Sequence, residues 1–296
     1  MRIGEIYREG RFGLSIEVFP PKTPQGDDAL SRTLERLAVY RPDFISCTYG
    51  AGGSTQDRTL EWCRTVQDEF AVTATGHLTC VGSTCDELLQ WLGKAEEYGI
   101  GNVMALRGDP PENQDTFETT RGGFGHANEL VGLIREKFPA MGIGVAGYPE
   151  THVEAPDPQT DLDNLKRKVE SGADAVYTQL FYDNISFFEF RERYLRAGIS
   201  APLVPGIMPI SEFARMKRIT SMCGSRFPDQ LAARLEAVQD DKQAQFEIGV
   251  EHAIGQCQEL KAEEVPGIHF YVLNRSQACE RILNELGMHP PKADCA

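Results

Sequence analysis

One acidic side chain stands inside an otherwise apolar run near the start of the chain. The run LSIEVFPPK, residues 14–22, alternates Leu14, Ile16 and Val18 with other positions, among them Glu17. Alternate residues of a strand point to opposite faces, so Glu17 faces away from the apolar trio. Apolar neighbours would raise the pKa of its carboxyl and let it act as a general acid near neutral pH. A structural carboxylate paired with Arg or Lys is the alternative.

Further polar residues stand at the ends of short β-rich runs. They are Thr48, Tyr49, His77, Arg107, Asp109, Tyr148, Glu150, Gln179, Asn274 and Arg275. A basic run, Lys166 to Lys168, lies in a helical stretch and is unusual in so acidic a chain. It is either a solvated helix face or a contact for a phosphate. These residue types suit acid–base chemistry on an anionic ligand.

Two glycine-rich segments resemble phosphate-binding loops. GAGGST, residues 50–55, could present backbone N–H groups to an anion, although it lacks the lysine of a P-loop and a plain turn is equally compatible. GIGVAG, residues 142–147, matches G-x-G-x-x-G but lies inside a predicted strand, so we reject it as a dinucleotide motif. Its small residues are expected to leave room in the fold for a flat ligand.

Composition excludes several classes of function. The net charge of -14 disfavours nucleic acid and anionic membranes as partners. The six histidines and eight cysteines include no HExxH or CxxC spacing, so no metal site is expected and the thiols are expected to be reduced. No leader or membrane-spanning run is visible, which predicts a cytoplasmic protein.

The elements that must position these residues alternate regularly. Eight predicted strands cover residues 14–20, 43–50, 72–79, 102–109, 142–150, 175–183, 202–209 and 268–274, and each is followed by an amphipathic stretch. Gly99, Gly172, Gly198 and Gly287 stand where helices should end. This pattern predicts one domain, residues 1–296, folded as an α/β (β/α)8 TIM barrel. Extra helices are expected within 228–265, before the last strand, and a frayed tail over 290–296. In such barrels, polar residues at the C-terminal ends of strands form the active site.

Nine segments occur in a characteristic order: IEVFPPK, TYGAGGST, GHLTC, ALRGDPP, AGYPETH, DLDNLKRKVESGAD, TQLFYD, PGIMPI and HFYVLNR. From about residue 12 to 288, they resemble the methylenetetrahydrofolate reductase family in its short bacterial, catalytic-domain form. The resemblance implies a barrel that binds FAD non-covalently. NADH or NADPH would reduce the flavin and leave, and 5,10-methylenetetrahydrofolate would then be reduced to 5-methyltetrahydrofolate in ping-pong order.

The resemblance also implies roles for individual residues. Glu17 matches the general acid that protonates N10 of the folate, and Asp109 matches the aspartate beside the flavin and the pterin. FAD contacts are expected from Thr48, Tyr49, His77, Arg107, Gly108, Asp109, His126, Ala127, Tyr148, His152, Asp161, Asn164, Arg167 and Lys168. Substrate contacts are expected from Glu17, Asp109, Gln179, Tyr271 and Arg275, with Arg275 on the glutamate tail.

Departures from the family pattern leave some choices open. His126 stands where many members have Tyr, and residues 212–219 match poorly in a helix that binds the nicotinamide donor in some members. NADH, NADPH and a protein electron donor therefore all remain possible, and a homo-oligomer is expected from the family alone. The alternative hypotheses are a different FAD-binding barrel oxidoreductase, similar to proline dehydrogenase, and a non-catalytic folate-binding paralogue. The paralogue would be expected to lose Glu17 or Asp109, and the chain has both.

Overall fold

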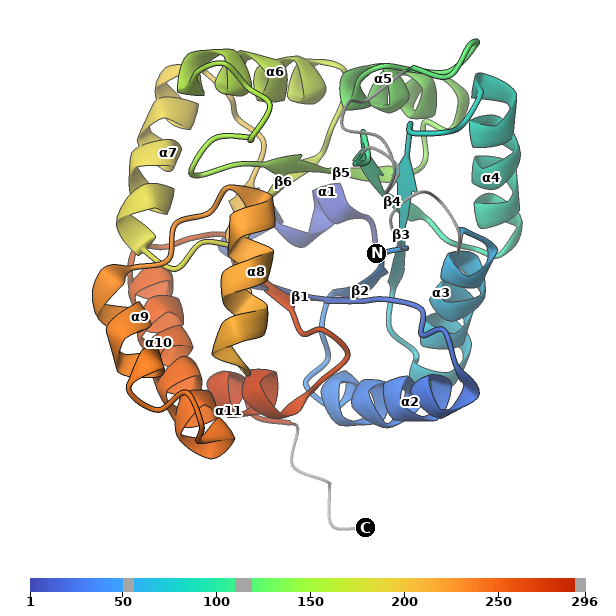
Figure 1. Ribbon diagram of the computed structural model, residues 1–296. Coiled ribbons are helices and arrows are strands. Elements are labelled where there is room, and N and C mark those ends of the chain that lie inside the picture. Colours follow the sequence, from blue (N-terminus) through green and yellow to red (C-terminus); the bar gives the residue numbers. More distant parts are fainter. Residues whose placement is uncertain (50–55, 110–118, 291–296) are drawn as a thin grey trace.

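A barrel of parallel strands forms the centre of the molecule. The computed structural model describes residues 1–49, 56–109 and 119–290. Figure 1 views the barrel end-on, with the strands surrounded by helices. The strands are β1 (Gly13–Val18), β2 (Phe44–Cys47), β3 (Ala74–Thr79), β4 (Asn102–Leu106), β5 (Gly142–Gly147), β6 (Ala175–Thr178), β7 (Leu203–Val204), β8 (Gly206–Ile207) and β9 (Gly267–Tyr271). The predicted (β/α)8 TIM barrel is confirmed.

The ring closes through one interrupted stretch of chain. The expected strand over 202–209 is divided into β7 and β8 by Pro205, which has no N–H to donate to a neighbouring strand. β7 pairs with β6 on one side, and β8 pairs with β9 on the other. The nine short strands therefore occupy the eight positions of the predicted barrel.

Helices follow the strands as predicted. Those of the repeating pattern are α2 (Pro24–Ala38), α3 (Gln56–Phe70), α4 (Cys85–Glu97), α5 (Ala127–Lys137), α6 (Pro158–Glu170), α7 (Asn184–Arg196), α8 (Phe213–Cys223) and α11 (Gln277–Glu285). The glycines expected at helix ends have positive φ, from 71° at Gly99 to 119° at Gly172. The extra helices before the last strand are α9 (Asp229–Glu236) and α10 (Lys242–Ala262), which lie outside the barrel (Figure 1).

The two faces of the strands contribute to different apolar clusters, one against the surrounding helices and one inside the barrel. On β1, the apolar trio beginning at Leu14 packs against the surrounding helices in the main core, which directs Glu17 to the barrel interior as expected. Ile3 and Ile6 of the short helix α1 (Ile3–Ile6) form a smaller cluster with interior residues such as Phe44. A third apolar cluster, which includes Phe213 and Leu231, supports α8 and α9.

The interior is narrow at β5. Its segment GIGVAG forms a strand over its whole length, so the rejection of a dinucleotide motif is confirmed. The expectation that its glycines leave room for a flat ligand is wrong at Gly142 and Gly144. A Cβ on Gly144 would lie 2.9 Å from both Met104 Sδ and Tyr177 Cε2, because those side chains already fill the space.

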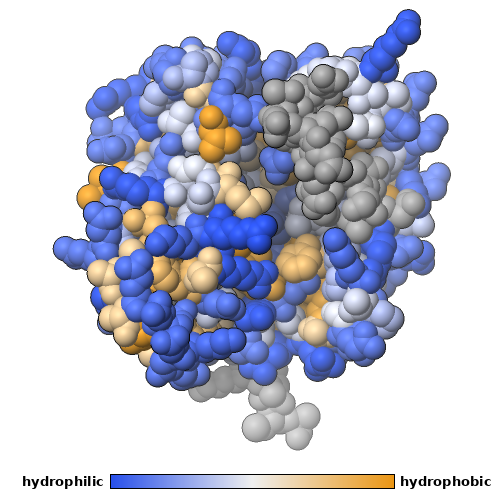
Figure 2. All heavy atoms as spheres, viewed as in Figure 1, coloured by the Kyte–Doolittle hydropathy of each residue, from blue (hydrophilic) through white to orange (hydrophobic). Residues whose placement is uncertain are grey.

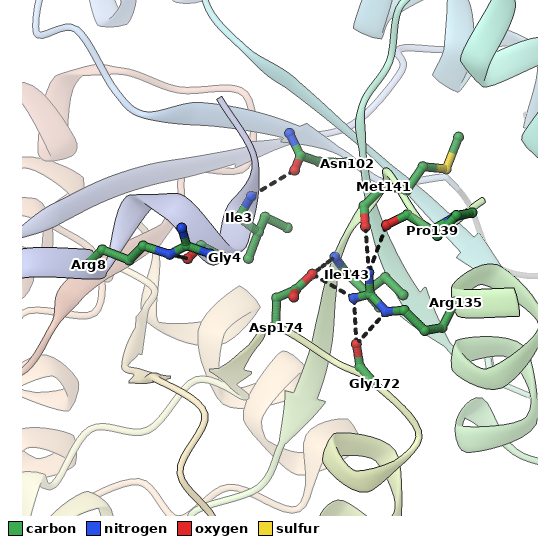
Figure 3. A network of polar contacts seen from close by, with 10 residues as sticks. All are labelled: Ile3, Gly4, Arg8, Asn102, Arg135, Pro139, Met141, Ile143, Gly172 and Asp174. Carbon is green, nitrogen blue, oxygen red and sulfur yellow. Dashed lines mark hydrogen bonds and ion pairs between the residues drawn. The ribbon is translucent and has the colours of Figure 1, made fainter.

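A polar network fastens the end of the barrel opposite the strand C-termini (Figure 3). Arg135 on α5 donates hydrogen bonds to the carbonyl of Gly172 at 2.6 Å and to the Asp174 carboxylate at 2.9 Å. Asp174 also accepts from the backbone N–H of Ile143 on β5, at 2.7 Å. The network joins α5, β5 and the start of β6, on the face of the barrel that serves stability.

Candidate active site

A cavity of about 490 Å³ lies at the C-terminal ends of the strands. Every residue assigned above to catalysis, FAD or substrate lines it, except Arg275. Arg275 is exposed in the segment after β9 and lies outside the cavity lining. Of the other polar strand ends, Glu150 accepts a hydrogen bond from the backbone of Arg226, and Asn274 bonds both backbone groups of Phe19. Both residues are structural in this arrangement.

The surroundings of the cavity are mixed in polarity. In Figure 2, which shows the same end of the molecule as Figure 1, hydrophilic residues predominate and apolar ones form small patches, some over α8 and α9. Ile219 and Cys223 of α8 reach the cavity wall. The glycine-rich segment over 50–55, residues 110–118 and the expected tail after residue 290 lie outside the described residues.

Glu17 lies between two histidines, and its side chain is 20% exposed. Its Oε2 is 3.2 Å from Nε2 of His77 on β3 and 3.7 Å from Nε2 of His269 on β9. Burial alone would raise the pKa of Glu17. The positive charge of His77 and the contacts to both imidazole rings lower it by a larger amount, so that the pKa falls to about 2. The expectation of apolar neighbours and a raised pKa is therefore wrong. At neutral pH the carboxyl is ionised, and the nearest proton donors are imidazoles.

His269 is the main functional candidate that the sequence reasoning missed. It alternates with Tyr271 on β9, and both side chains line the cavity. The strand register places His269 beside Ser15 and Tyr271 beside Glu17. Tyr271 was expected at the substrate only from the family resemblance, and period-two alternation from that position assigns His269 to the interior as well, so the signal was present in the sequence.

Glycines make room for the substrate side of the cavity. A Cβ on Gly206 would collide with the Tyr271 ring, so the ring can lie here only because residue 206 is glycine. The Tyr271 hydroxyl donates to the Thr178 carbonyl at 2.7 Å, beside Gln179. Gly108 has φ +89°, and a Cβ there would overlap Val81. That left-handed conformation carries the chain closely past β3 and brings Asp109 to the rim.

The opposite wall carries the basic residues. Arg107 forms a two-pronged ion pair with Glu154, with one contact at 2.8 Å. Lys168 on α6 donates to the Ala146 carbonyl at 2.6 Å, and its Nζ lies 5.9 Å from the centre of the Tyr148 ring. Burial lowers the pKa of Lys168 to about 8, with Arg107 acting in the same direction and Asp161 opposing. This wall can bind an anion, and its charge depends on pH.

Tyr49 and His152 shape the cavity at its edges. The Tyr49 hydroxyl donates to Thr79 Oγ1 at 2.7 Å, which ties the end of β2 to β3. His152 stacks edge-on against Tyr148 with ring centres 4.6 Å apart, and its backbone N–H donates to Asp161. Within the described ranges, no group of His, Cys, Asp and Glu side chains is arranged to hold a metal ion. In the same ranges, no helix has the length and apolar character needed to cross a membrane.

Comparison with known proteins identifies relatives over the whole fold. The profile of the family described as methylenetetrahydrofolate reductase matches residues 2–287. The Escherichia coli K12 protein named 5,10-methylenetetrahydrofolate reductase is 36% identical over 95% of this chain and 93% of its own length. The Arabidopsis thaliana protein named methylenetetrahydrofolate reductase (NADH) 1 is 40% identical over 97% of this chain. The chain spans about half the length of that plant relative.

A solved structure shares the barrel at low sequence identity. It is an uncharacterized protein from Clostridium thermocellum, described as binding two copies of 5-methyl-5,6,7,8-tetrahydrofolic acid. The TM-score is 0.60 at 12% identity, with 95% of this chain and 96% of that chain covered. At this identity the likeness supports the fold alone.

Proposed function

Because this chain belongs to the methylenetetrahydrofolate reductase family, we propose that it reduces 5,10-methylenetetrahydrofolate to 5-methyltetrahydrofolate with NADH or NADPH and bound FAD. The observation that carries the proposal is the convergence of the expected residues on one cavity, with Glu17 and Asp109 both in its lining. The Arabidopsis relative is named for NADH, which favours that donor. The family resemblance also supports a homo-oligomer.

The cavity residues suit FAD. Nδ1 of His77 is buried at the cavity wall and has no hydrogen-bond partner among the described residues, so it can serve the polar edge of a ligand. Arg167, Lys168 and Arg107 supply positive charge for a diphosphate, and Tyr148 offers an aromatic face. The chemistry that FAD supplies when bound is two hydride transfers, from the nicotinamide and then to the folate, in ping-pong order.

Glu17 delivers one proton to the folate. Protonation of N10 accompanies cleavage of the bond between N10 and the bridging methylene, and the electron pair of that bond stays on N10. The methylene then forms a double bond to N5 and accepts hydride as a methyl group. Because the pKa of Glu17 is lowered to about 2, the proton that it passes on is held by Glu17 and its neighbouring imidazoles as a unit. General acid catalysis of this kind contributes about 10²–10⁴ in rate.

Asp109 stabilises the cation that forms at N5. Its charge acts within the cavity, because it raises the pKa of Tyr148 and of Cys223, after the larger effect of burial in each case. A negative charge near a developing iminium stabilises the transition state more than the ground state. Gly108 sets its position at the rim.

Separate half-reactions test the proposal. Glu17→Gln should keep reduction of bound FAD by NADH or NADPH, followed by anaerobic stopped-flow absorbance, and should lose folate reduction by about 10²–10⁴. Glu35→Gln, an exposed change of the same kind on α2, should leave both half-reactions intact. Protein that binds no FAD would overturn the proposal. A Glu17→Gln variant that reduces folate at the normal rate would remove Glu17 as the acid.

A further inference from the structure

His269 is a fully buried polar ring with few polar neighbours. Its side chain is 0% exposed and is surrounded by the rings of Phe44, Tyr177 and Tyr271, with centres 6.0, 5.3 and 5.0 Å away. Nδ1 shares a hydrogen bond of 2.8 Å with Ser15 Oγ. Nε2 has no hydrogen bond to any described residue and faces Glu17 Oε2 at 3.7 Å. An aromatic enclosure with polar groups at its two ends leaves this imidazole to link Ser15 with Glu17.

Glu17, His269 and Ser15 form a row of polar side chains, and this row continues away from the cavity. Ser15 is buried one strand layer below Glu17, on the same face of β1. The next interior position down the strand is Gly13, and a Cβ there would collide with the ring of Tyr7. Glycine therefore allows the Tyr7 ring to lie beneath Ser15.

Tyr7 completes the row at the other end of the barrel. Its hydroxyl is 3.0 Å from that of Tyr177, and Tyr7 is partly exposed beside α1. Burial raises the pKa of Tyr7, while hydrogen bonding to Tyr177 and Ser15 partly offsets the rise. The phenol therefore stays protonated at neutral pH and can pass a proton without becoming charged. Glu17, His269, Ser15 and Tyr7 thus run from the cavity toward the N-terminal face.

We propose that His269, Ser15 and Tyr7 form a proton path that supplies protons to Glu17 from the N-terminal face of the barrel while substrate fills the cavity. This inference rests on the proposed function, since it assumes that Glu17 protonates the folate. It is needed because Glu17 is largely buried, with 20% of its side chain exposed, and lines the cavity in which the ligands are proposed to bind. A bound flavin and folate would cover that side and separate Glu17 from bulk water.

The transfers balance without leaving charge in the barrel. Glu17 starts as a carboxylate: the Nε2–H proton of His269 moves to it and from there to N10, which leaves Glu17 ionised again. Nδ1 takes the proton of Ser15, Ser15 takes that of Tyr7, and Tyr7 regains one from solvent. After product leaves, cavity water protonates Nε2, and the Nδ1 proton returns along the row, which restores the starting tautomer. In this scheme His269 is a positioning residue, since it acts on the folate only through Glu17.

Tyr7→Phe tests the path from the end remote from the cavity. The variant keeps the ring and removes only the hydroxyl, and Ser15→Ala interrupts the path at its middle. In both holoenzymes the folate half-reaction should slow by about fivefold or more and show a larger solvent deuterium isotope effect. The apparent KM for folate should stay unchanged, and the reduction of FAD by NADH should stay normal. Tyr40→Phe is the matched control, because its hydroxyl bonds Asn284 on the outside of the barrel.

The outcomes separate this inference from the proposed function. Normal rates and isotope effects in both Tyr7→Phe and Ser15→Ala would overturn the path, while a defective Glu17→Gln would leave the acid assignment standing. Equal slowing of both half-reactions with a lowered Tm would mean that the row is only structural, and would also overturn the path. If Ser15→Ala does not fold, Tyr7→Phe alone decides, since it leaves the strand unchanged.

Discussion

If the protein binds FAD as proposed, Lys168 should make that binding depend on pH in a range where an ordinary lysine would not. Its ammonium group is buried against Ala146 and Tyr148, and burial lowers its pKa to about 8. The diphosphate needs the charged form. As pH rises through about 8, the free protein loses this positive charge, so we predict that FAD affinity falls above that pH. Below pH 7 the lysine is fully charged, and the affinity should be level.

The size of the effect follows from the titration. With a pKa of about 8 in the free protein, the charged fraction falls from about nine-tenths to about one-tenth between pH 7 and pH 9. If FAD binds only the charged form, its Kd rises about tenfold over that interval, or about 1.4 kcal/mol. A lysine with an unperturbed pKa of about 10.4 would change the Kd very little there. A charge-assisted hydrogen bond, worth about 1.5–3 kcal/mol, sets the upper limit at higher pH.

A fluorescence titration of the apoprotein with FAD at pH 7, 8 and 9 measures this dependence directly. Lys168→Arg should flatten the profile, because a guanidinium stays charged throughout. Lys166→Arg, on the same helix but outside the cavity lining, should keep the wild-type profile. Equal slopes in the wild type and Lys168→Arg would refute the reasoning, since another group would then be responsible for the pH dependence.

Two further predictions concern the charged pairs at either end of the barrel. Glu154→Gln removes the carboxylate that competes with a phosphate for Arg107, so FAD should bind about two- to fivefold more tightly. The same titration at low salt measures this change. Weaker binding would mean that Glu154 is needed to orient Arg107. Arg135→Met should lower the free energy of unfolding by about 1–3 kcal/mol in urea denaturation, because the Asp174 carboxylate and the Gly172 carbonyl lose their shared donor. The exposed Arg64→Met should cost less than about 0.5 kcal/mol, and an equal loss in both variants would argue against the network.

Periodicity was sufficient to predict the barrel. Strand and helix patterns repeat along the chain, and glycines such as Gly99 mark helix ends by a conformation that other residues adopt with difficulty. The division at Pro205 was not predicted, although proline cannot donate a ladder hydrogen bond and its position in the strand was visible. The direction of Glu17 followed from its three apolar neighbours on the opposite face.

Contacts between distant strands could not be predicted in the same way. Glu17 and His269 are 252 positions apart in the chain, and only closure of the barrel brings β9 beside β1. The filled space at Gly144 likewise depends on side chains of other strands, Met104 of the adjacent β4 and Tyr177 of the adjacent β6. A period-two pattern tells which face a side chain occupies, whereas its partners depend on the register of the neighbouring strands.

The charge state of Glu17 changes how its chemistry must be understood. An isolated carboxyl among apolar groups would hold its own proton and need no supply until after the reaction. A carboxyl with a pKa of about 2 between His77 and His269 is ionised at rest, so in the proposed reaction the proton that Glu17 passes to the folate comes through an imidazole. Under this proposal, the rate of folate reduction depends on proton transfer through the barrel interior as well as on the acid itself. That dependence is why a hydroxyl at Tyr7, on the opposite side of the barrel from the folate, is expected to affect one half-reaction and not the other.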